Sequence, residues 1–213
     1  MKKKNYLHQS IRKKKKMNKI DLYIEDESDI YNEEYTKEDL SNLIIVNKTI
    51  SNTELDRCNL INSDYKNTYF EKVAFSNCDL SNTKFIECNF REVEFNNCKL
   101  VGVSINNCHI TKVTIKSSQC KYISIVDTKT KELSLEKSNF IESTFYNVEL
   151  SKVKLDNIDF KESEFVQMNL SGVNFSNCNI TAIRIDERSL KGIKVNQFQA
   201  LELAALLGIN IVE

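Results

Sequence analysis

Seven cysteines and two histidines are the side chains of this sequence best suited to catalysis or metal binding. Cys108 stands next to His109, and a nucleophilic cysteine needs a histidine within hydrogen-bond reach. A zinc site needs four thiolate or imidazole ligands that converge at tetrahedral geometry. Both kinds of site therefore depend on the elements that carry these residues.

Large apolar residues recur at every fifth position from Leu40 to Val195. Of these 32 positions 31 are hydrophobic, and Thr130 is the exception. A second column, two residues earlier in each repeat, is Cys, Ser, Thr, Val or Ile at 26 of 31 positions from Leu43 to Ile193. Large and small residues that alternate around a polar residue indicate extended strand.

A period of five fits neither a helix nor a continuous strand. On a helix the large residues would spiral over every face, and on a strand they would alternate between two faces. Both conflicts disappear if the chain turns once per repeat, so that it coils and pairs with itself about 4.8 Å away. The large residues then form one inward ladder, which we expect to include Leu80, Phe85, Phe90, Phe95, Leu100, Phe160, Phe165 and Phe175.

This geometry argues against an active site. Adjacent strand residues point to opposite sides, so Cys108 points inward and His109 outward. Six cysteines occupy the small inward column, where spacings of ten residues place successive thiols on opposite sides of the coil, and Cys120 occupies the large column. We interpret the cysteines as small core filler. We predict no catalytic residue, no metal, no cofactor and no small-molecule substrate.

Units such as Cys78-Asp79-Leu80-Ser81-Asn82 and Met168-Asn169-Leu170-Ser171-Gly172 resemble the A(D/N)LXX motif of bacterial pentapeptide-repeat proteins. The resemblance covers residues 40–195 and implies an all-β fold, a right-handed, four-sided β-helix. With about twenty residues per coil, the 32 repeats make about eight coils. Residues 116–137 are the weakest stretch, because Cys120 and Thr130 replace large residues while Ile123 and Leu133 replace small ones. We expect either a bent or narrower coil there, or a regular coil in which the exchanged large and small side chains compensate each other.

The resemblance also implies a function. Some members, including those that confer quinolone resistance, bind type II DNA topoisomerases, which is usually explained by a likeness to duplex DNA in width and acidity. A type II topoisomerase is therefore one expected partner of a non-enzymatic binding protein. A DNA mimic needs a strong negative field, however, and residues 41–213 hold 20 basic and 21 acidic groups. The alternative is a structural scaffold whose partner is unassigned.

The N-terminal residues lie outside the repeat as we define it. Residues 1–20 hold nine basic groups and no acid, and we expect a flexible, solvated tail that could otherwise attach to nucleic acid or an anionic membrane. Residues 21–39 are acidic, and we expect a short helix or irregular cap over the first coil. Its apolar and aromatic residues are Leu22, Tyr23, Ile24, Ile30, Tyr31 and Tyr35.

The C-terminal residues 196–213 read as a second cap. Asn196 is a candidate N-cap for a helix over 197–207, Gly208 a stop signal, and a short strand is expected after it. This helix either closes the core alone or also joins two copies in a homodimer, as in members of the family that dimerise through C-terminal helices. The residues that would do so are Phe198, Leu201, Leu203, Leu206, Leu207, Ile209 and Ile211.

The outer surface must then carry the function. A basic belt opposed by Asp127 alone is the candidate partner surface, and it comprises Lys112, Lys116, Lys121, Lys129 and Lys131. The odd number of cysteines, together with residues 5–11 that are too polar for a signal peptide, predicts a cytoplasmic protein with free thiols.

Overall fold

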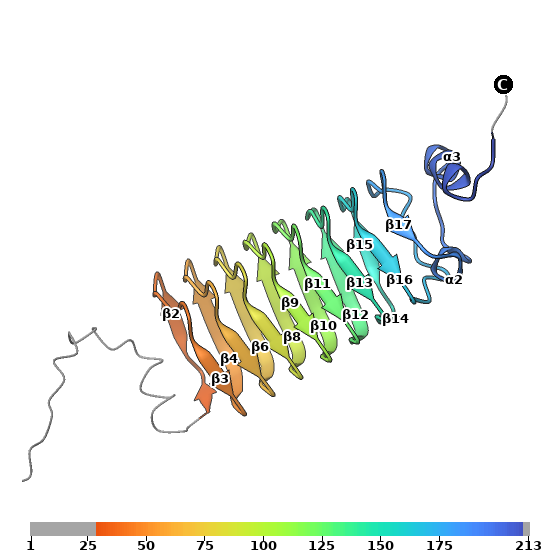
Figure 1. The fold of residues 1–213 in the computed structure, drawn as a ribbon. Coiled ribbons are helices and arrows are strands. Elements are labelled where there is room, and N and C mark those ends of the chain that lie inside the picture. Colours follow the sequence, from red (N-terminus) through yellow and green to blue (C-terminus); the bar gives the residue numbers. More distant parts are fainter. Residues whose placement is uncertain (1–28, 211–213) are drawn as a thin grey trace, which may run out of the picture.

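Residues twenty positions apart stack on one another in this protein, which a computed structural model describes over residues 29–210. Phe70 pairs with Ile50 one coil before it and with Phe90 one coil after it, and every such pairing is parallel. The result is a solenoid of about eight turns with a small helix at its C-terminal end (Figure 1). The predicted all-β coil is therefore confirmed.

Each central coil has four sides, and we number them in chain order. Sides 1 and 2 are the two halves of one long strand, side 3 is an isolated bridge such as that between Asn59 and Asp79, and side 4 is a short strand. The long strands are β4 (Thr49–Asp56), β6 (Tyr69–Ser76), β8 (Asn89–Asn96), β10 (His109–Lys116) and β12 (Lys129–Glu136). In the outer coils they are split into β1 (Ile30–Tyr31), β2 (Glu34–Thr36), β14 (Glu149–Ser151) and β15 (Lys154–Asp156).

Side 4 forms a sheet of its own. Its eight parallel strands are β3 (Ile44–Val46), β5 (Asp64–Lys66), β7 (Lys84–Ile86), β9 (Ser104–Asn106), β11 (Ser124–Val126), β13 (Thr144–Tyr146), β16 (Glu164–Val166) and β17 (Arg184–Ile185). The helices α2 (Glu187–Leu190) and α3 (Gln197–Leu206) follow. Neither they nor any other helix of the described residues is long and apolar enough to cross a membrane.

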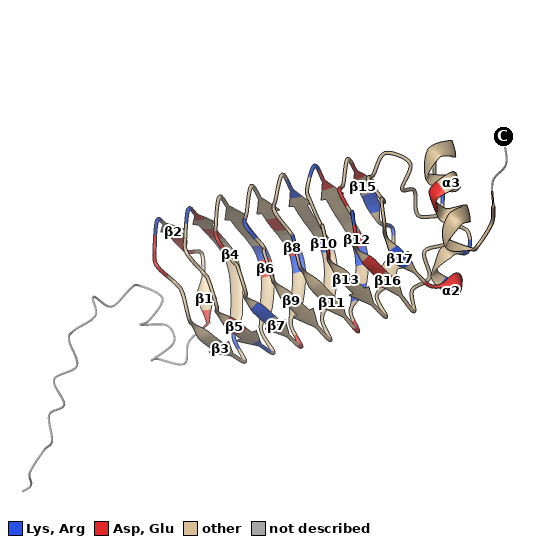
Figure 2. Cartoon of the chain, turned by 45° about the horizontal axis from the view of Figure 1, so that its top comes forward, with Lys and Arg blue, Asp and Glu red and all other residues tan. Residues whose placement is uncertain are grey.

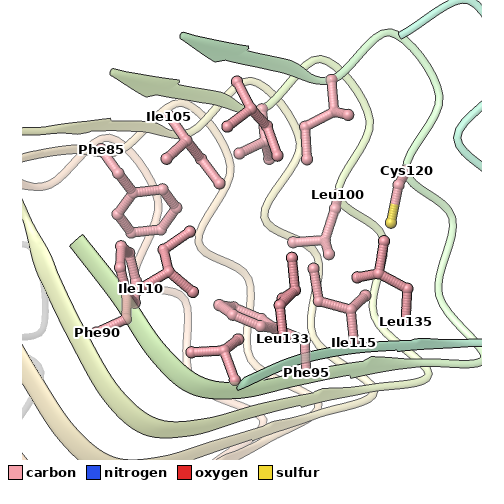
Figure 3. Close-up of a cluster of buried hydrophobic side chains, with 14 of the residues drawn as sticks. Phe85, Phe90, Phe95, Leu100, Ile105, Ile110, Ile115, Cys120, Leu133 and Leu135 are labelled. Atoms are coloured by element: carbon pink, nitrogen blue, oxygen red, sulfur yellow. The ribbon is translucent and has the colours of Figure 1, made fainter. Parts of the chain in front are cut away.

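The core is one continuous column of inward side chains. All eight residues of the expected ladder are buried, and aromatic rings stack coil upon coil, as Phe70 does on Phe90 at 5.0 Å between ring centroids. Aliphatic residues and Cys120 replace the rings in the middle coils (Figure 3). An enclosed apolar cavity of about 60 Å³ remains along this column. Residues 116–137 nevertheless stay in register, because β12 pairs with β10 along its whole length.

The N-terminal boundary differs from the expected one. Ile30 and Tyr35 are buried in the core, and they pair with Ile50 and Leu55 of the next coil. The solenoid therefore begins ten residues before Leu40, and residues 30–39 are part of its first coil rather than an irregular cap over it. The predicted tail, residues 1–20, and residues 21–28 lie outside the described part of the chain.

The corners are made by left-handed backbone. Every fifth residue from Asn32 to Gly172 has a positive φ, and many of these residues are asparagine, which tolerates this conformation better than most. Gly102 and Gly172 are the positions where glycine meets the need directly, with φ of 69° and 83°. The corner requirement therefore explains the two outward residues that end each repeat.

Tyr122 is the bulkiest residue at a left-handed corner, with φ of 60° and 53% of its surface exposed. We expect Tyr122→Gly to raise the free energy of unfolding by about 0.5–1 kcal/mol. Left-handed backbone costs an L-residue about 1–2 kcal/mol, which glycine avoids, but the greater conformational freedom of glycine in the unfolded chain offsets part of this gain. Urea titration measures the change. The control is Tyr146→Gly at an exposed position of β13, which should destabilise, and equal losses in both variants would contradict the explanation.

Candidate binding surfaces

The cysteines do more than fill space. The Cys78 sulfur accepts a hydrogen bond from the Cys58 amide at 3.4 Å and donates one to the Leu55 carbonyl at 3.3 Å. The Ser63 hydroxyl makes the same two bonds one side further along, to the Leu43 amide and the Leu40 carbonyl, both at 3.1 Å. Our interpretation of the thiols as filler is therefore incomplete, because they satisfy backbone groups that the corner removes from the strand ladder.

Side 2 shows the complementary choice of residue. Its small inward positions are apolar in the central coils and hold Val73, Val93, Val113 and Leu133. These residues lie within the long strands, whose ladder continues on both sides of the corner. At the equivalent position of β4, Thr53 is polar, and its hydroxyl donates to the Ser51 carbonyl at 2.9 Å. The small column is thus polar or thiol-bearing mainly where the ladder breaks.

The thiols stack in columns of residues that are twenty apart, which the spacing of ten between successive cysteines did not reveal. Cys58, Cys78 and Cys98 are twenty residues apart and lie on one side of the coil. All seven cysteines are free and buried. The hydrogen bond with Cys78 and burial raise the pKa of Cys58, and burial raises the pKa of Cys120. At these two positions the thiol is therefore held protonated, and a protonated thiol is a weak nucleophile and metal ligand.

The sequence neighbours Cys108 and His109 are not brought together. Cys108 is 1% exposed and points into the core, whereas His109 is exposed on the outside of β10. Within residues 29–210, no three His, Cys, Asp or Glu side chains gather in a way that could hold a metal ion. The outer surface is consequently where partners must be sought.

Outward side chains pair between neighbouring coils. Seven of the ten ion pairs formed among residues 29–210 join positions twenty apart, for example Lys99 with Asp79 at 3.2 Å. Asparagines do the same, since the Asn67 amide nitrogen donates to the Asn47 side-chain oxygen at 2.7 Å. In the view of Figure 2, positions of Lys and Arg and positions of Asp and Glu are interspersed along the coils. The outer field is therefore weak.

The five lysines of the expected partner surface do not share one side. Lys129 and Lys131 flank Thr130 on side 1, and Lys112 lies at the corner between sides 1 and 2. Lys116 ends side 2, and Lys121 follows side 3. Lys112 pairs with Glu92 at 3.4 Å, and Lys129 with Glu149 at 3.3 Å. Three of the five therefore lie on or beside side 1 and the other two on the following sides, so the five form no single patch.

Helix α3 covers the C-terminal end of the core. Leu203 is buried, and the Gln199 amide nitrogen donates to the carbonyls of Phe175 and Cys178 at 2.9 and 2.7 Å. The Asn196 side chain accepts from the amides of Phe198 and Gln199, so the expected N-cap is present. The helix ends at Leu206, the described residues 209–210 form no strand, and Ile211 lies outside the described residues.

The exposed apolar side chains gather at the two ends. Ten large hydrophobic residues of the described chain are exposed, and only Tyr122 and Tyr146 lie along the sides. Three belong to the first coil, namely Tyr31, Ile44 and Val46. Five belong to α3 and the residues after it, namely Phe198, Leu201, Leu206, Leu207 and Ile209. Both ends are therefore candidate binding surfaces.

The chain resembles several solved structures at low sequence identity. Trypsin-treated QnrB1, a plasmid-mediated fluoroquinolone resistance protein, is 17% identical, with 87% of this chain and 100% of that chain covered and a TM-score of 0.37. HetL from the cyanobacterium Nostoc, involved in heterocyst differentiation regulation, is 13% identical over 82% and 94% of the two chains, with a TM-score of 0.37. Rfr23 from the cyanobacterium Cyanothece is 11% identical over 82% and 96%, with a TM-score of 0.34.

No curated protein sequence matches the chain significantly. Two family models do match it. Residues 48–125 match the pentapeptide repeat region, and residues 149–183 match the model of pentapeptide repeats, which describes eight copies of the repeat. Both matches fall inside the solenoid and follow its five-residue period. The chain therefore belongs to the pentapeptide-repeat protein family.

Proposed function

We propose that this chain is a non-enzymatic binding protein that acts as a homodimer, joined through α3, and holds a macromolecular partner on the sides of the solenoid. The observation that carries the proposal is the set of five exposed apolar side chains on and after α3. Its free, buried thiols fit a reducing compartment, and we assign it to the cytoplasm as part of the same proposal.

The outward side of α3 suits contact with a second copy. Phe198 is 67% exposed and Leu201 50% exposed, on the side of the helix away from the buried Leu203. Burying a large apolar side chain contributes about 1.5–3 kcal/mol, and a twofold interface uses each residue twice. Such a dimer joins the two solenoids end to end and leaves their sides free.

A type II DNA topoisomerase is the partner that we propose for those sides, since other members of the family bind these enzymes. The protein would compete with DNA by shape or contact the enzyme–DNA complex. Because ion pairs between coils neutralise the surface, shape rather than charge would carry the contact. We therefore expect its affinity to change little with salt, unlike that of an acidic DNA mimic.

The experiment is a supercoiling assay with purified DNA gyrase, the full chain at micromolar concentration, and a quinolone added or left out. We expect the protein to inhibit supercoiling or to relieve quinolone inhibition, and to do so similarly at low and moderate salt. No effect in either arm would reject the topoisomerase. That result would favour the scaffold alternative, for which salt-sensitive binding of DNA or anionic vesicles, lost on deletion of residues 1–20, is the test.

A further inference from the structure

At the N-terminal end of the solenoid, one side exposes the edge of an apolar strand. On side 4, the first strand of the sheet is β3, which pairs with β5 on one edge only. Ile44 is 71% exposed and Val46 42% exposed on this strand. An apolar edge strand without a charged side chain is open to pairing.

Two backbone groups of β3 lack the partners that their counterparts have. In the next coils, the amide of Asp64 donates to the Leu43 carbonyl at 2.8 Å, and the amide of Lys84 to the Ser63 carbonyl at 2.9 Å. The Ile44 amide holds the same position, and no described residue accepts from it. Likewise the Lys66 carbonyl accepts from the Asn47 amide at 3.0 Å, while the Val46 carbonyl has no donor among residues 29–210.

Two of the other three sides of the first coil are guarded. On sides 2 and 3 the small inward positions hold Glu33 and Glu38, where later coils hold residues such as Cys, Ser, Thr or Val. Inward-pointing charges at the end of a sheet oppose the addition of another strand. Side 4 alone has an apolar residue there, Leu43, which packs against the core. Inward charges thus oppose pairing on sides 2 and 3, whereas the apolar edge of β3 is open to it.

We propose that residues 22–25 of the same chain bind this edge as a parallel strand, with Leu22 over Leu43 and Ile24 over Ile45. This register continues both inward columns with apolar side chains and directs Glu25 outward. Pairing at the regular spacing of twenty would instead place Glu25 over the buried Ile45. The register of 21 leaves one extra residue before the coil begins, which a bulge absorbs.

The position of Asp29 makes the same chain the best-placed donor of this strand. Asp29 starts side 1, where its carboxylate accepts from the Thr49 amide at 2.6 Å. Side 4 precedes side 1 along the coil, so residues 26–28 need only cross one corner. So short a tether gives an effective concentration in the millimolar range, which an untethered strand would have to exceed. The bound segment would also block pairing of solenoids through their N-terminal ends, and it leaves the α3 end free.

Amide hydrogen exchange of the full chain, followed by NMR, tests the proposal. We expect the Ile44 amide to exchange about a hundredfold more slowly than an unstructured amide, as in a closed ladder. The double variant Leu22→Asp/Ile24→Asp should remove this protection, and the control Glu25→Ala should keep it. The Ser104 amide, bonded to the Thr83 carbonyl at 3.0 Å, should stay protected throughout and so report that the coils remain folded.

Three results would overturn the proposal. The first is an Ile44 amide that exchanges freely in the unmodified chain. The second is protection that survives the double variant, which would mean that another group covers the edge. The third is protection that increases with protein concentration together with the sedimentation mass, which would assign the edge to a second copy.

Discussion

Replacing Gln199 by leucine is expected to lower the free energy of unfolding by about 3 kcal/mol, although the two side chains have similar volumes. Gln199 is buried, and it donates to two carbonyls of the last coil while its oxygen accepts from the Asn196 amide at 2.9 Å. Leucine would leave three backbone groups without partners, and each such group costs about 1–3 kcal/mol when it stays buried. Urea titration followed by circular dichroism measures the loss.

The matched control lies two residues earlier in the same helix. Gln197 is exposed, so Gln197→Leu makes the same chemical change without removing a buried bond. We expect its unfolding midpoint to stay within experimental error of the unmodified chain. Equal midpoints for the Gln199 and Gln197 variants would show that α3 does not close the solenoid as described.

Cys78→Val is expected to destabilise the protein by about 2 kcal/mol, because valine cannot bond to the Cys58 amide or the Leu55 carbonyl. Cys78→Ser should be nearly neutral, since the Ser63 and Ser143 hydroxyls already make both bonds at equivalent positions. If the thiol were only filler, valine would be tolerated better than serine. The free energies of unfolding of the two variants therefore distinguish the roles.

Side 2 offers the reciprocal substitution. Val93 is buried within β8, where the ladder is continuous. Val93→Ser should lose about 1–2 kcal/mol of apolar burial, which a hydroxyl bond like that of Thr53 to the Ser51 carbonyl at 2.9 Å would offset only in part. If both Val93→Ser and Cys78→Val left the free energy of unfolding unchanged, the link between corner geometry and the residue types of the small inward column would be contradicted.

The period of five was sufficient to predict the coil, because the large hydrophobic residues that fill its core recur at that fixed spacing. It was not sufficient to place the first coil. Ile30 and Tyr35 follow the same period, but Glu33 and Glu38 stand where Cys, Ser or Val were expected. An end coil needs charge at those positions because it has no coil above it. The residue types that define the small inward column are therefore lost in the first coil, where they would have marked the start of the solenoid.

The surface was harder to predict because its contacts follow the spacing of twenty rather than five. Lys112 and Glu92 are four repeats apart in the sequence, yet they form an ion pair between neighbouring coils. The spacing of twenty also stacks Cys58 on Cys78. Lys116 and Lys131 do not follow it, and they lie on different sides. Reading the small column in steps of twenty would have separated the apolar side 2 from the polar sides.

Sedimentation equilibrium of the full chain tests the central functional proposal, a homodimer joined through α3, most directly. We expect a mass of twice 24.7 kDa, which Phe198→Lys/Leu201→Lys should reduce to that of one chain. The control Tyr122→Lys removes an exposed aromatic side chain from the side of the solenoid and should leave the dimer intact. A mass of one chain at high protein concentration, or a dimer that survives the double variant, would contradict the proposal.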